Sequence, residues 1–258
     1  MPRKARQKSH TGIYHIIYRG ANRQEIFHDN EDRLQFLQTL EKYSTLYKVK
    51  IYAWCLMSNH VHLLLKEGNE DISITIKRIA VSFVKYYHFK YNTSGHLFED
   101  RFKSENVETV EYLLTVVRYI HQNPLKARMV RAVEESGWSS CRQYYQLTSI
   151  TRFVNCDLIL NMFGEDRTTA IERFKEFNET VNDDRCLEDV DTDRRRLTDD
   201  EARSVINRII GKIEIAQVKS LPKENRDHIL RKVKGIEGVS QRQVARILGV
   251  SQTLIYRA

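Results

Sequence analysis

The sequence predicts an α+β fold for the first part of the chain, followed by an all-α region. Segments with strand and helix patterns follow one another in the order β-α-β-β-α-β-α up to residue 122. This order favours an antiparallel sheet with helices packed on one face. From residue 157 onward the patterns are helical. The length, 258 residues, suits one medium domain with one or two small modules.

Four strands are predicted, at residues 12–18, 50–57, 60–66 and 101–108. The first, GIYHIIY, alternates and is rich in β-forming residues. The second and third are separated only by Ser58 and Asn59, a connection of hairpin length. We therefore expect these two strands to pair directly.

Three helices are predicted between and after the strands, at residues 30–47, 72–90 and 111–122. In each, apolar residues recur every three or four positions, as Ile72, Ile76 and Ile79 do. Pro124 is expected to end the third helix.

The remainder divides into a helical and acidic segment and a second module. Residues 157–181 have a helical pattern, and residues 182–196 are polar like a linker. Thr198 and Glu201 form a T-x-x-E capping box that opens a helix through Ile210, with three short helices after it. The predicted units are residues 1–150, 151–196 and 197–258.

The charge distribution points to a polyanionic partner. The net charge is +8 and the pI is about 9.2. Residues 1–150 carry 22 Lys and Arg against 15 Asp and Glu, residues 151–201 carry 8 against 15, and residues 202–258 carry 12 against 4. Two basic blocks thus flank an acidic one, which favours nucleic acid as the partner, with solvated charged surfaces as the simpler explanation.

Composition excludes several other classes of protein. Hydrophobic residues make up 41% of the chain, which argues against a disordered or collagen-like protein. There is no run of eighteen apolar residues and no secretory leader at the N-terminus, so we expect a cytoplasmic protein without a membrane partner. The four cysteines, Cys55, Cys141, Cys156 and Cys186, are far apart and are expected to be reduced.

Two histidines in the third strand are candidate metal ligands. His60 and His62 lie two residues apart, so they share one face of the strand, where two imidazoles can chelate a divalent ion. A polar sheet face is the simpler explanation of this pair. In the third helix, Tyr119 and Asn123 lie one turn apart at the edge of the apolar stripe, together with Tyr112. The other histidines have no such spacing and are expected to be structural.

Five segments together resemble the HUH single-tyrosine transposases of small bacterial insertion sequences, and most closely the REP-associated tyrosine transposases. They are YHIIYRGANRQEIF (14–27), MSNHVHLLL (57–65), LFEDRFKSENVE (97–108), RYIHQNP (118–124) and WSS (138–140). The resemblance covers about residues 10–146. One departure is Ser58, where the family commonly has proline. The implied fold is the HUH endonuclease fold, a ferredoxin-like antiparallel sheet.

The resemblance implies a catalytic set and a reaction. His60 and His62 match the His-hydrophobic-His motif, Tyr119 the nucleophile, and Asn123 the polar ligand one turn further on. A Mg²⁺ or Mn²⁺ ion held by these ligands would polarise the phosphate of a single-stranded DNA that carries a hairpin. Attack by Tyr119 would leave a 5′-phosphotyrosine and a free 3′-hydroxyl, which allows rejoining without ATP. The sequence suits a monomer or a homodimer.

Cations near these motifs are candidate phosphate contacts. They are Arg19, Arg23, Arg101, Lys103, Arg118, Lys126 and Arg128. Residues 240–258 fit a helix-turn-helix with Gly249 at the turn and Ser251 as the cap of the second helix. If that helix enters duplex DNA, its contacts would be Gln252, Thr253, Tyr256 and Arg257. A three-helix packing module is the alternative.

Three functions remain open at this point. The first is a metal-dependent single-stranded DNA transposase or a domesticated relative of one. The second is a non-catalytic DNA-binding regulator derived from a transposase. The third is an RNA-processing protein, because a similar sheet also binds single-stranded RNA.

Overall fold

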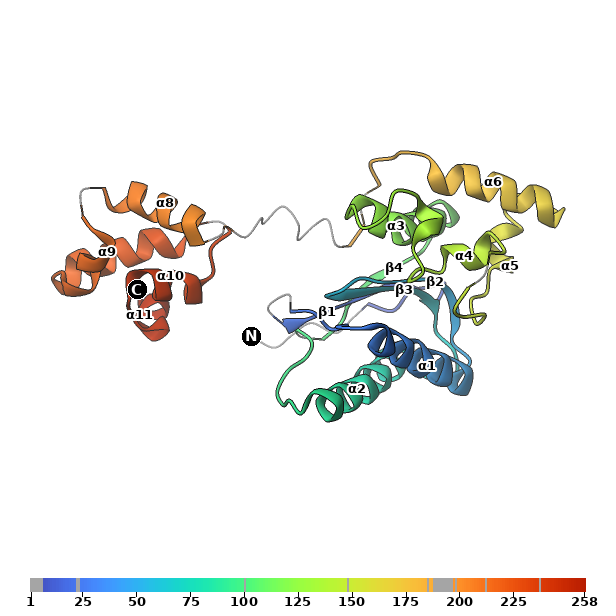
Figure 1. The fold of residues 1–258 in the computed structure, drawn as a ribbon, viewed down its shortest axis with the longest axis horizontal. Helices are drawn as coiled ribbons and strands as arrows, with labels where there is room; N and C mark the ends of the chain where they lie inside the picture. The colour runs from blue at the N-terminus through green and yellow to red at the C-terminus, as the bar shows by residue number, and fades with distance from the viewer. Residues whose placement is uncertain are drawn as a thin grey trace. The chain divides into compact units, whose positions relative to one another are not determined.

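The computed structural model describes residues 7–21, 24–99, 101–147, 149–184, 186–187, 197, 199–211, 213–236 and 238–258. The chain divides into two compact units, Met1–Glu188 and Asp189–Ala258. Each unit has its own hydrophobic core. Figure 1 shows the sheet and its helices in the first unit and a group of helices in the second.

The first unit is built on a four-stranded sheet. Its strands are β1 (Ile13–Arg19), β2 (Lys50–Leu56), β3 (His60–Lys66) and β4 (Lys103–Asn106), in the order β2-β3-β1-β4. Each neighbouring pair is antiparallel, and β2 and β3 pair directly across the short connection. The predicted α+β class and antiparallel sheet are confirmed, with β4 shorter than the predicted strand. β1 and β3 are the two central strands, so side chains on them are enclosed by neighbours on both sides.

Helices cover both faces of this sheet, whereas the prediction placed them all on one. α1 (Asn30–Tyr47) and α2 (Ile72–Tyr91) pack on one face, where the Tyr18 hydroxyl donates to the Ile76 carbonyl oxygen. α3 (Val110–Lys126) packs on the other face, against β2 and β3 (Figure 1). The reason is that β3 is buried on both sides, Val61 and Leu63 on one and His62 and Leu64 on the other.

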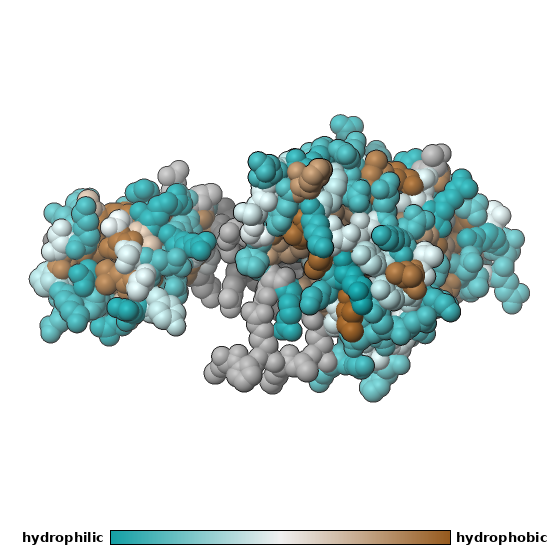
Figure 2. Space-filling view, turned by 90° about the horizontal axis from the view of Figure 1, so that it is seen from below, coloured by the Kyte–Doolittle hydropathy of each residue, from teal (hydrophilic) through white to brown (hydrophobic). Residues whose placement is uncertain are grey.

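The layer formed by α1 and α2 closes one side of the unit. On that side hydrophilic residues predominate and hydrophobic residues lie in small separate patches (Figure 2). Asp29 caps α1, and the Lys90 ammonium of α2 contacts the carboxylates of Asp29 and Asp32 at 2.7 and 2.9 Å. These contacts tie the beginning of α1 to the end of α2.

Pro124 was expected to end the helix that carries Tyr119, but it lies inside the last turn of α3. The Ala127 amide donates to the Asn123 carbonyl oxygen and the Met129 amide to the Pro124 carbonyl oxygen, both at 2.9 Å. A proline this close to a helix end removes one donor without interrupting the bonds that follow. Asn123 is therefore held within the helix.

The first unit also extends beyond the predicted boundary at residue 150. α4 (Cys141–Tyr144), α5 (Asp157–Leu160) and α6 (Arg167–Glu179) follow a short 3₁₀ turn at Val133–Glu135. The single helix predicted at residues 157–181 is thus two helices, the second capped by Asp166. Phe174 of α6 is wholly buried and stacks on Tyr144 at a centroid distance of 4.7 Å. Residues up to 184 therefore belong to the first unit, with α6 packed on its core.

The second unit is all-α, as predicted. It comprises α8 (Asp199–Ile210), a 3₁₀ segment at Ile215–Ser220, α9 (Lys223–Lys234), α10 (Gln241–Leu248) and α11 (Gln252–Arg257). Gly249 adopts a left-handed φ of 65° between α10 and α11, and the Ser251 side chain caps α11. The predicted cap at Thr198 and the predicted linker residues 188–196 lie outside the described residues.

Two further expectations can be compared with the structure. Within the described ranges, none of the helices is long and apolar enough to cross a membrane. All four cysteines are buried and have free thiols.

Candidate active site

His60 and His62 lie on the face of the sheet that α3 covers. In the antiparallel register His60 is opposite Arg19 and His62 is opposite Ile17. The two imidazole centroids are 5.0 Å apart. The shared face predicted from their spacing is therefore present, at the end of β3 next to the tight turn.

A third histidine joins this pair from the neighbouring strand. His15 of β1 places its Nε2 3.2 Å from Nδ1 of His62, and the two rings stack with centroids 5.5 Å apart. The sequence analysis assigned His15 a structural role because it has no partner at a short spacing. Only the pairing of β1 with β3, about fifty residues away, brings it to His62.

Tyr119 meets the histidines from α3. Its ring lies edge-on to His62 at a centroid distance of 5.7 Å and to His15 at 6.0 Å. The side chain is 4% exposed. Asn123 follows one turn later, and its amide nitrogen is 3.3 Å from the Tyr119 carbonyl oxygen, to which it donates. The predicted nucleophile and the predicted ligand pair thus come together across the sheet–helix interface.

Burial keeps the histidines of the site neutral. Burial, assisted by the Arg19 guanidinium, lowers the pKa of His60 to about 3. Burial and the neighbouring His60 hold the pKa of His62 well below its ordinary value. Neutral imidazole is the form that binds metal ions, so both side chains are in the ligating state near neutral pH.

The hydrogen bond of His60 also defines which of its nitrogens can bind a metal. His60 Nδ1 is 2.6 Å from the Asn59 side-chain oxygen. Because an amide oxygen only accepts hydrogen bonds, the ring proton is on Nδ1 and the lone pair is on Nε2. The predicted donor set is two imidazoles and the Asn123 amide, whose nitrogen is engaged with the Tyr119 carbonyl oxygen. In the described part of the chain, no three His, Cys, Asp or Glu side chains are grouped to hold a metal. Mg²⁺ and Mn²⁺ accept such mixed ligands and keep positions for other oxygen atoms.

Three of the predicted phosphate contacts surround the histidines. Arg19 is in register with His60, and Lys103 of β4 is in register with Ile17, beside His62. The Lys126 ammonium lies 5.2 Å from the centroid of the Tyr119 ring. Arg101 and Arg128 are exposed, and Arg23 lies outside the described residues. The face that carries His62 and Tyr119 therefore also carries cations, together with the carboxylate of Glu105, which is in register with His15.

Arg118, also predicted to contact DNA, is engaged within the protein. Its guanidinium makes two bonds to the Asp184 carboxylate, at 2.7 and 2.9 Å, and lies 4.2 Å from the centroid of the Phe177 ring. The Arg118 guanidinium is therefore occupied by protein partners.

Residues 178–184, which we call the strap, hold α3 from outside the sheet. The Gln122 amide donates to the carbonyl oxygens of Asn178 and Thr180 at 2.8 and 3.0 Å. Asn182 donates in turn to the Gln122 side-chain oxygen at 2.9 Å. Together with the pair between Arg118 and Asp184, these bonds hold the helix turn that carries Tyr119. The sequence does not indicate the strap, because residues 178–181 fit the end of the predicted helix and residues 182–184 fit the beginning of the predicted polar linker.

The predicted DNA contacts of the second unit are all on one short helix. Gln252, Thr253, Tyr256 and Arg257 of α11 are exposed. Gln252 accepts a bond from Arg242 of α10, and the Lys234 ammonium donates to the Tyr256 carbonyl oxygen at 2.8 Å. These contacts order the exposed polar side of α11 without burying it.

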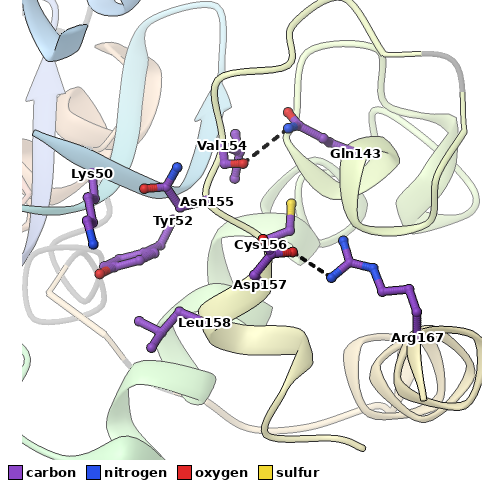
Figure 3. A pocket seen from close by; sticks show the side chains of 9 residues that line it. All are labelled: Lys50, Tyr52, Gln143, Val154, Asn155, Cys156, Asp157, Leu158 and Arg167. Carbon is purple, nitrogen blue, oxygen red and sulfur yellow. Dashed lines mark hydrogen bonds and ion pairs between the residues drawn. The ribbon is translucent and has the colours of Figure 1, made fainter. Parts of the chain in front are cut away.

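A hollow of about 370 Å³ lies at the edge strand β2, and none of the candidate site residues lines it (Figure 3). Lys50, at one end of its lining, is in register with Lys66, six residues along β3 from His60. Arg167, which also lines the hollow, is paired with Asp157 at 2.6 Å. This hollow is separate from the candidate active site.

Residues 8–123, which lie within the first unit, match the family described as Transposase IS200 like. This part of the chain is similar to IS200-like transposases. The matched range includes His15, His60, His62, Tyr119 and Asn123, and ends before the strap.

Two solved structures are similar to parts of the chain. The structure of a REP-associated tyrosine transposase bound to a REP hairpin has 18% identity and a TM-score of 0.49, covering 59% of this chain and 95% of that chain. A Deinococcus radiodurans R1 protein described as a candidate transposase has 19% identity and a TM-score of 0.33, covering 47% of this chain and 97% of that one. No curated protein matches the sequence.

Proposed function

We propose that the chain is a divalent-metal-dependent enzyme that cleaves and rejoins single-stranded DNA beside a hairpin, with Tyr119 as the nucleophile. The observation that carries the proposal is the contact of Tyr119 with His62 across the interface between α3 and β3. It brings a hydroxyl-bearing ring to a pair of neutral imidazoles on the face that also carries Arg19 and Lys103. The family match of residues 8–123 supports transposition as the setting.

His60, His62 and Asn123 are the residues that would hold the ion. Mg²⁺ or Mn²⁺ in this place would polarise the scissile phosphate and offset the charge that develops on the leaving oxygen. Arg19, Lys103 and Lys126 would contact the flanking phosphates.

The reaction assigned to Tyr119 is a transfer of the phosphoryl group to its side chain. The Tyr119 oxygen forms a bond to phosphorus and loses its proton, while the bond from phosphorus to the 3′-oxygen breaks and that oxygen takes up a proton. The product is a 5′-phosphotyrosine and a free 3′-hydroxyl. Attack by another 3′-hydroxyl reverses the step and joins two strands.

The second unit supplies a candidate surface for duplex DNA. Its basic side chains and the exposed residues of α11 fit phosphate and groove contacts. A non-catalytic DNA-binding regulator is the second candidate function. The 4% exposure of Tyr119 favours it, because a nucleophile must reach its phosphate.

The test is the formation of a covalent adduct. The full chain is incubated with labelled hairpin oligonucleotides and Mn²⁺, and the products are separated on a denaturing gel. Tyr119→Phe should abolish the adduct while DNA affinity stays within about twofold. Tyr112→Phe is the matched control, because Tyr112 lies on the same helix but donates to Glu105.

The outcomes separate the candidate functions. An adduct on DNA but not on the matched RNA, mapped to Tyr119, supports the proposed enzyme. Tight DNA binding without any adduct supports the regulator, and an adduct only on RNA supports an RNA-processing enzyme. An adduct mapped to Tyr112 would contradict the assignment of the nucleophile.

A further inference from the structure

His15 is a wholly buried histidine that the reaction above does not use. Its exposed fraction is 0%, and its Nε2 lies 3.2 Å from Nδ1 of His62. Its other ring nitrogen, Nδ1, is buried and has no hydrogen-bond partner within the described residues. A buried polar atom without a partner costs stability, so this imidazole is an unfavourable way to fill a core.

The bond between His15 and His62 can be made by two tautomers. If His62 Nδ1 carries the proton and donates it, His62 keeps a lone pair on Nε2. If His15 Nε2 carries the proton, the proton of His62 is on Nε2 and that nitrogen cannot bind a metal. Only the first arrangement leaves His62 able to act as a ligand.

His60 provides a direct comparison within the same site. The Nδ1 of His60 donates to the Asn59 side-chain oxygen, which places the lone pair of His60 on Nε2. Each of the two candidate ligands thus has one acceptor for its Nδ1 proton, Asn59 for His60 and His15 for His62. Metal-binding histidines in proteins are commonly oriented in this way by a second hydrogen bond.

We propose that His15 is a positioning residue that accepts the Nδ1 proton of His62 and so presents the His62 Nε2 lone pair to the metal. It acts through His62 and does not bind the ion. Its ring also packs edge-on against Tyr119 at 6.0 Å, so the same side chain contacts one ligand and the nucleophile.

The proposal rests on the proposed function, and the experiment separates the two. Mn²⁺ affinity of the full chain is measured by calorimetry for the wild type, His60→Ala, His15→Leu, His15→Gln and His121→Gln. His15→Leu should weaken Mn²⁺ binding by about 10–100-fold, as loss of an outer-shell partner typically does. His15→Gln should recover part of this loss, because its side-chain oxygen can accept the same proton.

His121→Gln is the matched control. His121 is equally buried, but its two ring nitrogens bond to Ser140 and Asn178. Its Mn²⁺ affinity should stay within about twofold of the wild type. His15→Leu should also regain adduct formation at high Mn²⁺ concentration, which a loss of folding would not allow.

Two measurements on the wild type do not depend on how the variants fold. Electron spin echo spectra of bound Mn²⁺ should show two imidazoles, and nitrogen NMR of the Mg²⁺-loaded protein should show His62 protonated on Nδ1. Three imidazoles, protonation on Nε2, or unchanged Mn²⁺ affinity in His15→Leu would overturn the role of His15. If the wild type binds no Mn²⁺, or His60→Ala binds it equally well, the proposed function fails as well.

Discussion

Replacing Arg118 by methionine should lower the free energy of unfolding of the first unit and leave the affinity for DNA unchanged. Sequence position alone makes Arg118 a DNA contact, because it precedes Tyr119. In the structure the side chain is 14% exposed and its partner Asp184 is 13% exposed. The charge is thus neutralised inside the protein and ties α3 to the strap.

The size of the effect follows from this burial. Exposed ion pairs contribute at most about 1 kcal/mol, whereas removing one partner of a buried pair costs about 3–5 kcal/mol. A pair that retains one-seventh of its exposure belongs near the lower end of the second range, and the lost contact with Phe177 adds to it. We therefore expect Arg118→Met to reduce the free energy of unfolding by about 3 kcal/mol, and Asp184→Asn by a similar amount.

Tryptophan fluorescence during urea denaturation measures this unit alone. The chain has two tryptophans, Trp54 and Trp138, and both lie in the first unit. With a urea dependence of about 2 kcal/mol per molar, the midpoint should fall by about 1.5 M. The double variant Arg118→Met, Asp184→Asn should be more stable than the sum of the two single losses indicates.

The matched control is Lys126→Met, which should behave in the opposite way. Lys126 is exposed beside Tyr119, so its loss should leave the urea midpoint unchanged and reduce the salt dependence of DNA binding by about one unit of slope. If Arg118→Met instead kept the midpoint and lowered the salt slope, the ion pair with Asp184 would not exist in solution and our reasoning about the strap would be wrong.

Three further predictions concern the metal, the domain boundary and acid stability. His60→Ala should abolish Mn²⁺-dependent adduct formation and keep the fold, as checked by the denaturing gel and circular dichroism; full activity in EDTA would remove the metal role. A fragment of residues 1–188 should fold and cleave hairpin DNA, whereas residues 1–150 should not fold, because α5, α6 and the strap are missing; limited proteolysis distinguishes them. Although burial opposes the shift, hydrogen bonds from Lys90 and Tyr91 hold the pKa of Asp32 below its ordinary value. This carboxylate therefore stabilises the fold above its unfolded pKa of about 4 and loses that effect as pH falls through the lower folded pKa. The free energy of unfolding, measured between pH 5 and 2, should then fall more steeply with decreasing pH in the wild type than in Lys90→Met.

The parts of the site that the sequence predicts are those encoded over short distances. His60 and His62 are two residues apart, and Tyr119 and Asn123 are one helical turn apart. The periodicity of a strand or helix is enough to place such pairs on one face. The four strands and the antiparallel sheet follow from the same local patterns.

The parts that could not be predicted depend on pairing between distant segments. His15 becomes relevant only through the register of β1 with β3, and neither its neighbours nor its spacing indicate this. That α3 covers a second face of the sheet could not be predicted either, because it also depends on how distant segments pack together. β2 is apolar at successive positions, as in Ala53, Trp54 and Cys55, and such a run fits a strand buried on both sides as well as a helix segment.

The strap, which supports the proposed nucleophile Tyr119, lies beyond the family match, and no local sequence pattern indicates it. The strap follows residue 123, where the match ends, by about fifty residues, yet it bonds to the turns on both sides of Tyr119. If Tyr119 is the nucleophile, as proposed, its hydroxyl must be held at a fixed distance from the phosphate. Since β3 holds the histidines through the sheet, the distance between the proposed ligands and Tyr119 depends on how firmly α3 is attached. That attachment is made on the inner side by the contacts of Tyr119 with His62 and His15, and on the outer side by the strap. The strap is thus the element through which residues beyond the family match would affect the proposed reaction of Tyr119.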